Sequence, residues 1–163
     1  MSLVDLTGAY DLHVHANPEL FLRIGDDLDL ARHASQSGLA GIMIKNHFES
    51  TVGRAALADR MVEGTRVFGG LVLNWFTGGL NPLAAETALR MGARQIWMPT
   101  VDATAHAAAF GQTGGFTHQK SGLKLPRPGI SVLDEDDRLK PEVTVIVELV
   151  KEAGAIMGTG HLS

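Results

Sequence analysis

Two histidines separated by one residue end an apolar run near the start of the sequence, in YDLHVHANPE (residues 10–19). Residues i and i+2 of a strand point to the same side, so His13 and His15 share a face if this run is a strand. Two imidazoles presented together are typical of a site for zinc or a similar divalent ion. The sequence therefore predicts a metal site here, provided that other parts of the chain bring further ligands to this pair.

Other polar residues follow the ends of other apolar runs. Lys45 and His47 share a face at the end of GIMIK, and His161 follows AIMG. We predict His47 and His161 as further metal ligands, and Lys45, Asn74 and Thr100 as residues that bind the substrate. A single histidine is also commonly satisfied by a backbone carbonyl, so a purely structural role stays open for each of them.

Lys45 is expected at the last buried position of its strand, beside the histidines. An ammonium group there would repel a metal ion, so we expect it to bind an anionic group of the substrate, to be neutralised by Asp11 or another acid, or to be chemically modified. Extension of the side chain to the surface is the alternative. Lys45 is thus also a candidate catalytic residue, and Asp102 is the nearest candidate for a general base.

The elements that position these residues follow from the alternation of short apolar, β-rich runs with helical patterns, which is typical of a parallel α/β sheet. The runs predict strands at 10–15, 41–45, 66–73, 95–98 and 155–158, and helices at 26–38, 50–64, 81–92 and 140–154. Asn81 suits a helix N-cap, and Pro82 suits the first helical position. Sites in parallel α/β folds form at the carboxyl ends of the strands, where all the candidate residues fall.

One interval, 101–139, is longer than a simple crossover between strands requires. It is rich in Gly and Pro and contains His106 and His118, which we expect to be solvated. Long segments of this kind act as lids or binding loops, or are solvated insertions. Both interpretations stay open.

Composition bounds the remaining possibilities. The 163 residues suit one domain, 1–163, and the net charge of −4 gives no basic surface for nucleic acid or an anionic membrane. The chain has no cysteine, so any metal must be held by histidine, carboxylate or water. No apolar run has the length of a membrane span and no secretion signal is visible, so we expect a soluble, cytoplasmic protein with a small-molecule substrate.

The stretches DLHVHANPE and GHLS resemble the amidohydrolase-like metal-dependent hydrolases, whose (β/α)8 barrel carries HxH after its first strand and a metal-ligating histidine after its fifth. Together with IMIKNHFEST, VFGGLVLN, GGLNP and WMPT, they resemble a subgroup of predicted hydrolases in that superfamily over almost the whole chain. The resemblance implies hydrolysis of an amide, ester or phosphoester with a divalent metal: zinc first, with manganese, iron or nickel as alternatives. His13, His15 and His161 carry over as ligands.

The sequence also departs from that family. A lysine or glutamate that bridges two metals is common after strand four, but MPTVD offers only Thr100 and Asp102, which favours a single metal ion. The family's ligand after strand six and its aspartate base after strand eight would lie beyond Ser163. A complete barrel needs about 250 residues, so we expect a partial (β/α)8 barrel of about five units or an open five-stranded sheet. Its unpaired edges favour a homo-oligomer, although a fragment of a longer protein is also consistent.

Two alternatives to the hypothesis of an amidohydrolase-like enzyme stay open. PHP-type phosphoesterases also begin with HxH and have an aspartate-histidine pair after strand two, which IKNHF matches with Asn46 in place of the aspartate. That resemblance implies His47 as a direct ligand. The other alternative is a noncatalytic metal- or ligand-binding domain, or a truncated domain that only associates with itself.

Overall fold

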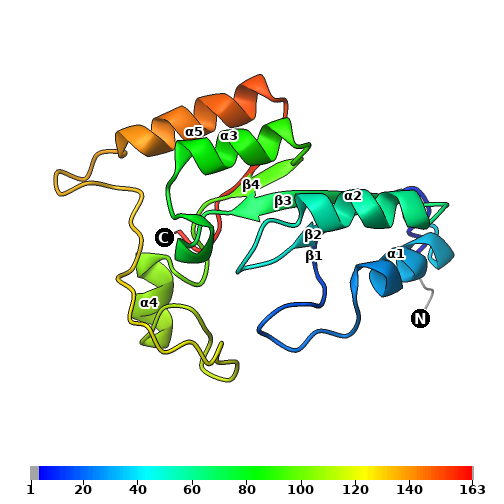
Figure 1. Cartoon of the computed structure of the whole chain (residues 1–163), viewed down its shortest axis with the longest axis horizontal. Helices are drawn as coiled ribbons and strands as arrows, with labels where there is room; N and C mark the ends of the chain where they lie inside the picture. The colour runs from blue at the N-terminus through cyan, green and yellow to red at the C-terminus, as the bar shows by residue number, and fades with distance from the viewer. Residues whose placement is uncertain (1–3, 163) are drawn as a thin grey trace.

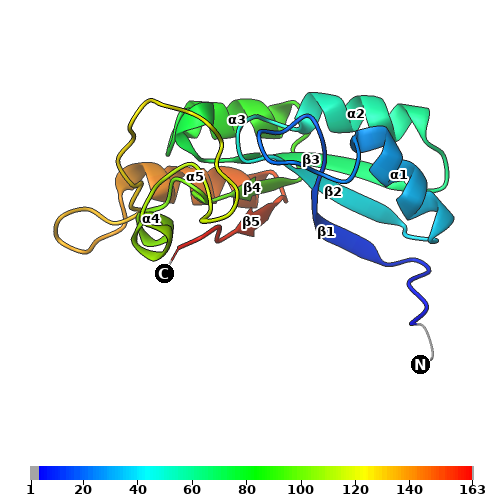
Figure 2. The same ribbon diagram turned by 90° about the horizontal axis from the view of Figure 1, so that it is seen from below.

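The structure is a computed structural model that describes residues 4–162. Five parallel strands form one sheet in the order β1-β2-β3-β4-β5, curled into a half-barrel (Figures 1 and 2). The strands are β1 (Tyr10–His15), β2 (Gly41–Lys45), β3 (Arg66–Val72), β4 (Gln95–Trp97) and β5 (Ile156–Gly158). Each strand pairs with the next one along the chain, as in a (β/α) barrel. The predicted α/β class is therefore confirmed, and the predicted strands agree with the observed ones to within one residue at each end.

Four helices cover the convex face of the sheet (Figure 2). They are α1 (Asp27–Gln36), α2 (Val52–Met61), α3 (Pro82–Arg90) and α5 (Pro141–Glu152). Each is slightly shorter than its prediction. The Asn81 side chain accepts hydrogen bonds from the backbone N–H groups of Leu83 and Ala84, so the predicted N-cap of α3 is confirmed. None of the helices among the described residues is long and apolar enough to cross a membrane.

The core lies mainly between this helical layer and the sheet, in two clusters. One cluster joins α1 and α2 to the first three strands, and the other joins α3 and α5 to the last three. A smaller cluster of Met43, Val72 and Trp97 lies on the concave face. A Cβ at Gly70 would lie 2.2 Å from the Gln95 carbonyl oxygen and 2.6 Å from the Trp97 ring, so only glycine lets Trp97 pack across β3 at this point. The Trp97 ring thereby lies next to Lys45, whose Nζ is 5.5 Å from the centre of the ring.

The first strand has an irregularity that bears on the site. Asp11 is in register with Ile42 and Val14 with Ile44, so Leu12 and His13 together oppose a single residue of β2. The register then places His15 beside Lys45. Bulges of this kind re-aim side chains next to functional sites, and here the bulge lies at the first of the two candidate ligands.

The interval 101–139 is not entirely irregular. It contains α4 (Thr104–Phe110), which lies with η1 (Trp75–Thr77) toward the carboxyl ends of the strands (Figure 1), while residues 111–139 form no helix or strand. His118 is exposed, as expected, but the expectation that His106 is solvated is wrong. His106 is 2% exposed, because α4 packs it against the rings of Phe110 and Phe116.

Candidate functional site

A pocket of about 340 Å³ opens at the carboxyl ends of β1, β2 and β5. All four predicted metal ligands and Lys45 line it, although they come from three separate segments of the chain. The lining residues are His13, His15, Arg23, Lys45, His47, Phe116, Gln119 and His161. A larger groove of about 610 Å³ between α2 and α3 is lined by no histidine, so the chemistry is concentrated in the smaller pocket.

The predicted convergence of His13 and His15 is present. Their Nε2 atoms lie 3.3 Å apart. With Zn–N bonds of about 2.0–2.1 Å, two nitrogens bound to one tetrahedral ion lie about 3.3–3.4 Å apart. The two imidazoles therefore already have the spacing that one shared ion requires.

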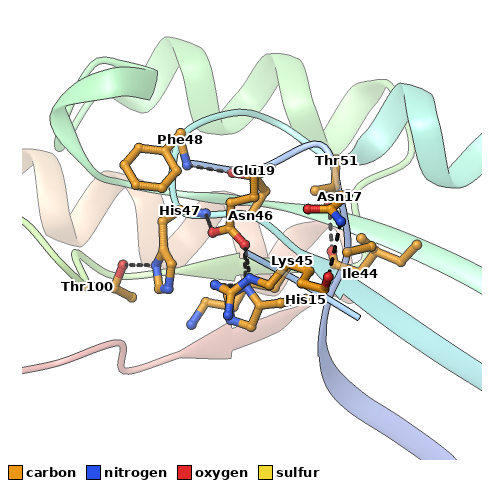
Figure 3. Close-up of polar contacts among 12 residues, drawn as sticks. His15, Asn17, Glu19, Ile44, Lys45, Asn46, His47, Phe48, Thr51 and Thr100 are labelled. Atoms are coloured by element: carbon orange, nitrogen blue, oxygen red, sulfur yellow. Dashed lines mark hydrogen bonds and ion pairs between the residues drawn. The ribbon is translucent and has the colours of Figure 1, made fainter. Parts of the chain in front are cut away.

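Glu19 and Arg23 belong to the site but were missed from the sequence. The Glu19 side chain is fully buried, and its Oε2 lies 3.3 Å from His15 Nδ1 and accepts from Arg23 Nε at 2.5 Å. Its Oε1 accepts from the His47 backbone N–H at 3.2 Å (Figure 3). His15 Nδ1 also lies 3.3 Å from Arg23 Nη2, so the ring either donates to the Glu19 carboxylate or accepts from this guanidinium. Only the first arrangement leaves the Nε2 lone pair of His15 facing His13, which is the usual arrangement behind a metal-binding histidine.

Burial alone would raise the pKa of the Glu19 carboxyl, but the hydrogen bonds from His15 and Arg23 hold it below its ordinary value. The side chain is therefore a carboxylate, able to accept from both partners. Among residues 4–162, the set of three candidate ligands whose donor atoms lie within 4.8 Å of one another is His15, Glu19 and His47, so Glu19 is also within reach of a bound ion. Both of its oxygens already accept from the protein, which favours an orienting role. Within the same residues, His13 and His161 belong to no such set of three, so the predicted meeting of His13, His15 and His161 around one ion is not formed as the chain is folded.

The loop that carries Glu19 is held in place by Arg54 of α2. This guanidinium donates to the backbone carbonyl oxygens of residues 16–18 and pairs with Asp27 at the start of α1, at 2.6 Å. Hydrogen bonds to Asp27 and Glu49 keep the pKa of Arg54 above its ordinary value even though burial opposes this. The position of Glu19 behind His15 thus depends on a contact between the first loop and the second helix.

His47 is 3% exposed, and its Nδ1 is hydrogen-bonded to Thr100 Oγ1 at 2.8 Å (Figure 3). Burial, and then the nearby His15 and Lys45, lower the pKa of His47 far below its ordinary value, so the ring is neutral. Asn74 Nδ2 donates to the His47 carbonyl oxygen and to Thr100 Oγ1, both at 2.9 Å. Asn74 and Thr100 are fully buried and do not line the pocket. As the chain is folded, these two predicted substrate contacts lie behind His47 and support it.

Asp102, the predicted general base, is also kept away from the histidines. Its fully buried carboxylate accepts from the Trp75 backbone N–H at 3.0 Å and from Arg127 Nε at 3.4 Å. Burial raises the pKa of Asp102 although these partners oppose the shift. The structure therefore does not bring Asp102 to the pocket with the other candidates.

Lys45 is 2% exposed, so its side chain does not extend to the surface. Its Nζ lies 3.2 Å from His13 Nε2 and 5.5 Å from the centre of the Trp97 ring. Asp11 does not neutralise it, because Asp11 instead accepts from the His13 backbone N–H, and within residues 4–162 no carboxylate lies within ion-pair distance of Lys45. Burial lowers the pKa of Lys45 to about 8.

His161 reaches the pocket from the end of β5 and contacts a histidine that the sequence did not single out as a site residue. His161 Nδ1 lies 2.9 Å from His106 Nδ1, and His106 Nε2 lies 2.8 Å from the Gly115 carbonyl oxygen. Phe116 packs against both rings. Burial, together with the charge of Lys45, lowers the pKa of His161 to about 4.

The model of a family of unknown function, DUF6282, matches residues 8–163, so the chain belongs to this family. Comparisons with curated proteins and with solved structures found no match. The matched region includes every residue that lines the pocket.

Proposed function

Because membership of this family names no reaction, we propose from the geometry that the protein is a metal-dependent hydrolase of an amide, ester or phosphoester. The observation that carries this proposal is the 3.3 Å separation of the His13 and His15 Nε2 atoms in a pocket also lined by His47 and His161. Zinc is the first choice of metal. Imidazole also suits iron and nickel, and manganese accepts mixed nitrogen and oxygen ligands, so these stay as alternatives.

In this proposal His13 and His15 hold the ion, and His161 and His47 are the candidates for the remaining positions. Glu19 acts on His15 from behind, orienting the ring and increasing the basicity of its Nε2. A divalent ion bound there would supply a Lewis acid and make a water molecule more acidic. One ion per chain is expected, because the segment after β4 offers no second bridging ligand to the pocket.

The pocket favours a substrate with an anionic group. Lys45 and Arg23 line it, and none of its lining residues carries a carboxylate. Lys45 is buried, and within residues 4–162 no carboxylate lies within ion-pair distance of it, whereas a buried charge is costly unless it is paired. A phosphoryl or carboxylate group of the substrate would supply that partner, and Lys45 would also stabilise negative charge that develops during hydrolysis.

Two alternatives remain. The first is a PHP-type phosphoesterase. It is favoured by the position of His47, which lines the pocket, but Asn46 does not line the pocket. The Asn46 amide instead donates to the Pro18 carbonyl oxygen and accepts from the Phe48 backbone N–H, so it offers no second ligand. A noncatalytic metal-binding domain would use the same imidazoles without turnover, and only an activity measurement separates it from the enzyme.

The first test is metal binding. Metal-free protein, titrated with zinc in a calorimeter and then analysed for bound metal after desalting, is expected to retain about one ion per chain. The double variant His13→Ala/His15→Ala is expected to retain none, whereas His33→Ala, in an exposed residue of α1, is expected to behave like the wild type. Unchanged metal content in the double variant would overturn the proposal.

The second test is turnover with zinc or manganese present. The panel contains phosphomonoesters and carboxylate-bearing amides and esters, each matched with a neutral analogue. We expect anionic members to be preferred, and Lys45→Met to lower kcat/KM for them by about ten- to a hundredfold, the value of a lost charge-assisted hydrogen bond. Stoichiometric metal binding without turnover of any member would instead favour the noncatalytic domain.

A further inference from the structure

The contact between His106 and His161 allows the ring protons of both residues to be assigned. Both side chains are held in place: His106 is buried on α4, and His161 follows β5. A backbone carbonyl oxygen only accepts hydrogen bonds, so the 2.8 Å contact of His106 Nε2 with the Gly115 oxygen requires a proton on that nitrogen. A neutral imidazole carries a single N–H, which leaves His106 Nδ1 as an acceptor.

The second contact then follows from the first. His106 Nδ1 and His161 Nδ1 are hydrogen-bonded at 2.9 Å, and two nitrogens at this distance share one proton. Since His106 Nδ1 accepts, the proton belongs to His161 Nδ1. A neutral His161 that carries its proton on Nδ1 has none on Nε2.

The other possible assignment makes His106 a cation that donates from both nitrogens. That would put an unpaired charge in a site 2% exposed to solvent, between the rings of Phe110 and Phe116. Among the described residues no carboxylate is hydrogen-bonded to His106, and the buried Asp102 is already engaged by Trp75 and Arg127. Burial of an unpaired charge is strongly unfavourable, so the neutral assignment holds.

We propose that His106 is a positioning residue that fixes His161 as its Nδ1–H tautomer, so that the Nε2 lone pair of His161 is available to the pocket. The tautomer follows from the hydrogen bonds alone, whereas its use in metal binding rests on the proposed function. The interval 101–139 gains a role beyond a lid or a solvated insertion. It supplies both the histidine and the Gly115 carbonyl oxygen that together orient a ligand delivered by a distant strand.

The direct test is the protonation of the ring nitrogens in the metal-free wild-type protein. Long-range ¹H–¹⁵N correlation spectra at neutral pH distinguish Nδ1–H from Nε2–H imidazoles. We expect Nδ1–H for His161 and Nε2–H for His106, while the exposed His33 shows mainly the Nε2–H form that is common in water. An Nε2–H signal from His161 would overturn the assignment, and this measurement requires neither metal nor turnover.

Two variants test the consequence for binding. His106→Phe keeps a ring of similar size but accepts no hydrogen bond, whereas His106→Gln retains an acceptor and a donor. We expect His106→Phe to lose the Nδ1–H signal of His161 and to weaken zinc binding about 10- to 100-fold, the usual effect of removing the partner of a ligating histidine. His106→Gln should recover most of both properties.

The outcomes separate the two proposals. If wild-type protein shows the expected tautomers but binds none of zinc, manganese, iron and nickel, the hydrolase proposal fails and the assignment stands. If folded His106→Phe, checked by circular dichroism, binds zinc as tightly as the wild type, the positioning role is overturned. If His106→Phe does not fold, His106→Gln and the wild-type spectra still decide the assignment.

Discussion

At the scale of single residues, the protein keeps three of its site imidazoles, His13, His47 and His161, uncharged near neutral pH. His47 is the most buried of the four predicted ligands, and burial is the first cause of the lowered pKa of His47 and of His161. Partial burial and the charge of Lys45 likewise lower the pKa of His13 to about 4, although much of this residue is exposed. A metal binds the neutral ring, so protons do not compete with a metal for these nitrogens near neutral pH.

The same pKa shifts predict how stability depends on pH. In the unfolded chain these histidines titrate near 6.5, but in the folded chain His13 and His161 titrate near 4. Between these values the unfolded state binds more protons, so the free energy of unfolding of metal-free protein should fall as the pH is lowered through this window. Urea denaturation at several pH values measures this dependence of the free energy of unfolding on pH.

Two variants control this measurement. His161→Gln, which cannot titrate, should show a smaller loss of stability over the same window. His33→Gln, in an exposed residue of α1, should show the same loss as the wild type. A free energy of unfolding that stays constant across the window would contradict the assigned shifts.

At the scale of elements, the site is joined by residues that follow the carboxyl ends of neighbouring strands. Asn74, after β3, donates to the His47 carbonyl oxygen after β2 and accepts from the Thr100 backbone N–H after β4 at 2.8 Å. It also accepts, at 3.3 Å, from the backbone N–H of Asp102. A single side-chain amide thereby joins the ends of three strands. The backbone groups that are hydrogen-bonded to it are buried, so solvent water could not take its place if the amide were removed.

Replacement of this amide should be more damaging than loss of an exposed cap. Asn74→Ala leaves several buried donors and acceptors without a partner, each costing about 1–3 kcal/mol, so the free energy of unfolding should fall by more than about 2 kcal/mol. Asn81→Ala removes only the N-cap of α3 and should cost about 1 kcal/mol. Chemical denaturation compares the two, and equal losses would contradict the role assigned to Asn74.

The elements were predictable because their signals are local. Continuous apolar runs marked the five strands, and Asn81 with Pro82 marked the start of α3. The short helix α4 was not predicted because its N-cap residue, Ala103, makes no side-chain cap, and the helix sequence TAHAAAF has no clear amphipathic period. For that reason His106 was expected in a solvated loop.

The site was only partly predictable from the sequence, because some of its contacts join segments that are far apart in the chain. The HxH spacing and the positions after strand ends pointed to His13, His15, His47 and His161, which all line the pocket. Glu19 lies only four residues after His15, and that spacing was a usable signal that was missed. The pairing of His106 with His161 joins residues 55 apart, and no spacing rule in the sequence encodes it.

At the scale of the whole molecule, the half-barrel has two open edges. Within residues 4–162, β1 pairs only with β2, and β5 pairs only with β4. Apolar side chains at these edges are exposed: Tyr10 at 55%, Leu12 at 46% and Ile156 at 41%. An unpaired edge strand with apolar neighbours is a template for further pairing, and proteins usually cover such an edge.

We therefore predict that the chain associates with itself through these edges. Size-exclusion chromatography with light scattering should give a mass at least twice that of the chain. The variant Leu12→Lys places a charge on the β1 edge and should shift the mass toward the monomer, because an edge charge opposes strand pairing. Leu57→Lys, on the outer surface of α2 where Leu57 is 62% exposed, is the matched control and should leave the mass unchanged. A wild-type monomer that melts cooperatively would contradict this prediction. It would mean that the curled sheet is stable with both edge strands unpaired, so that no association is needed to cover them.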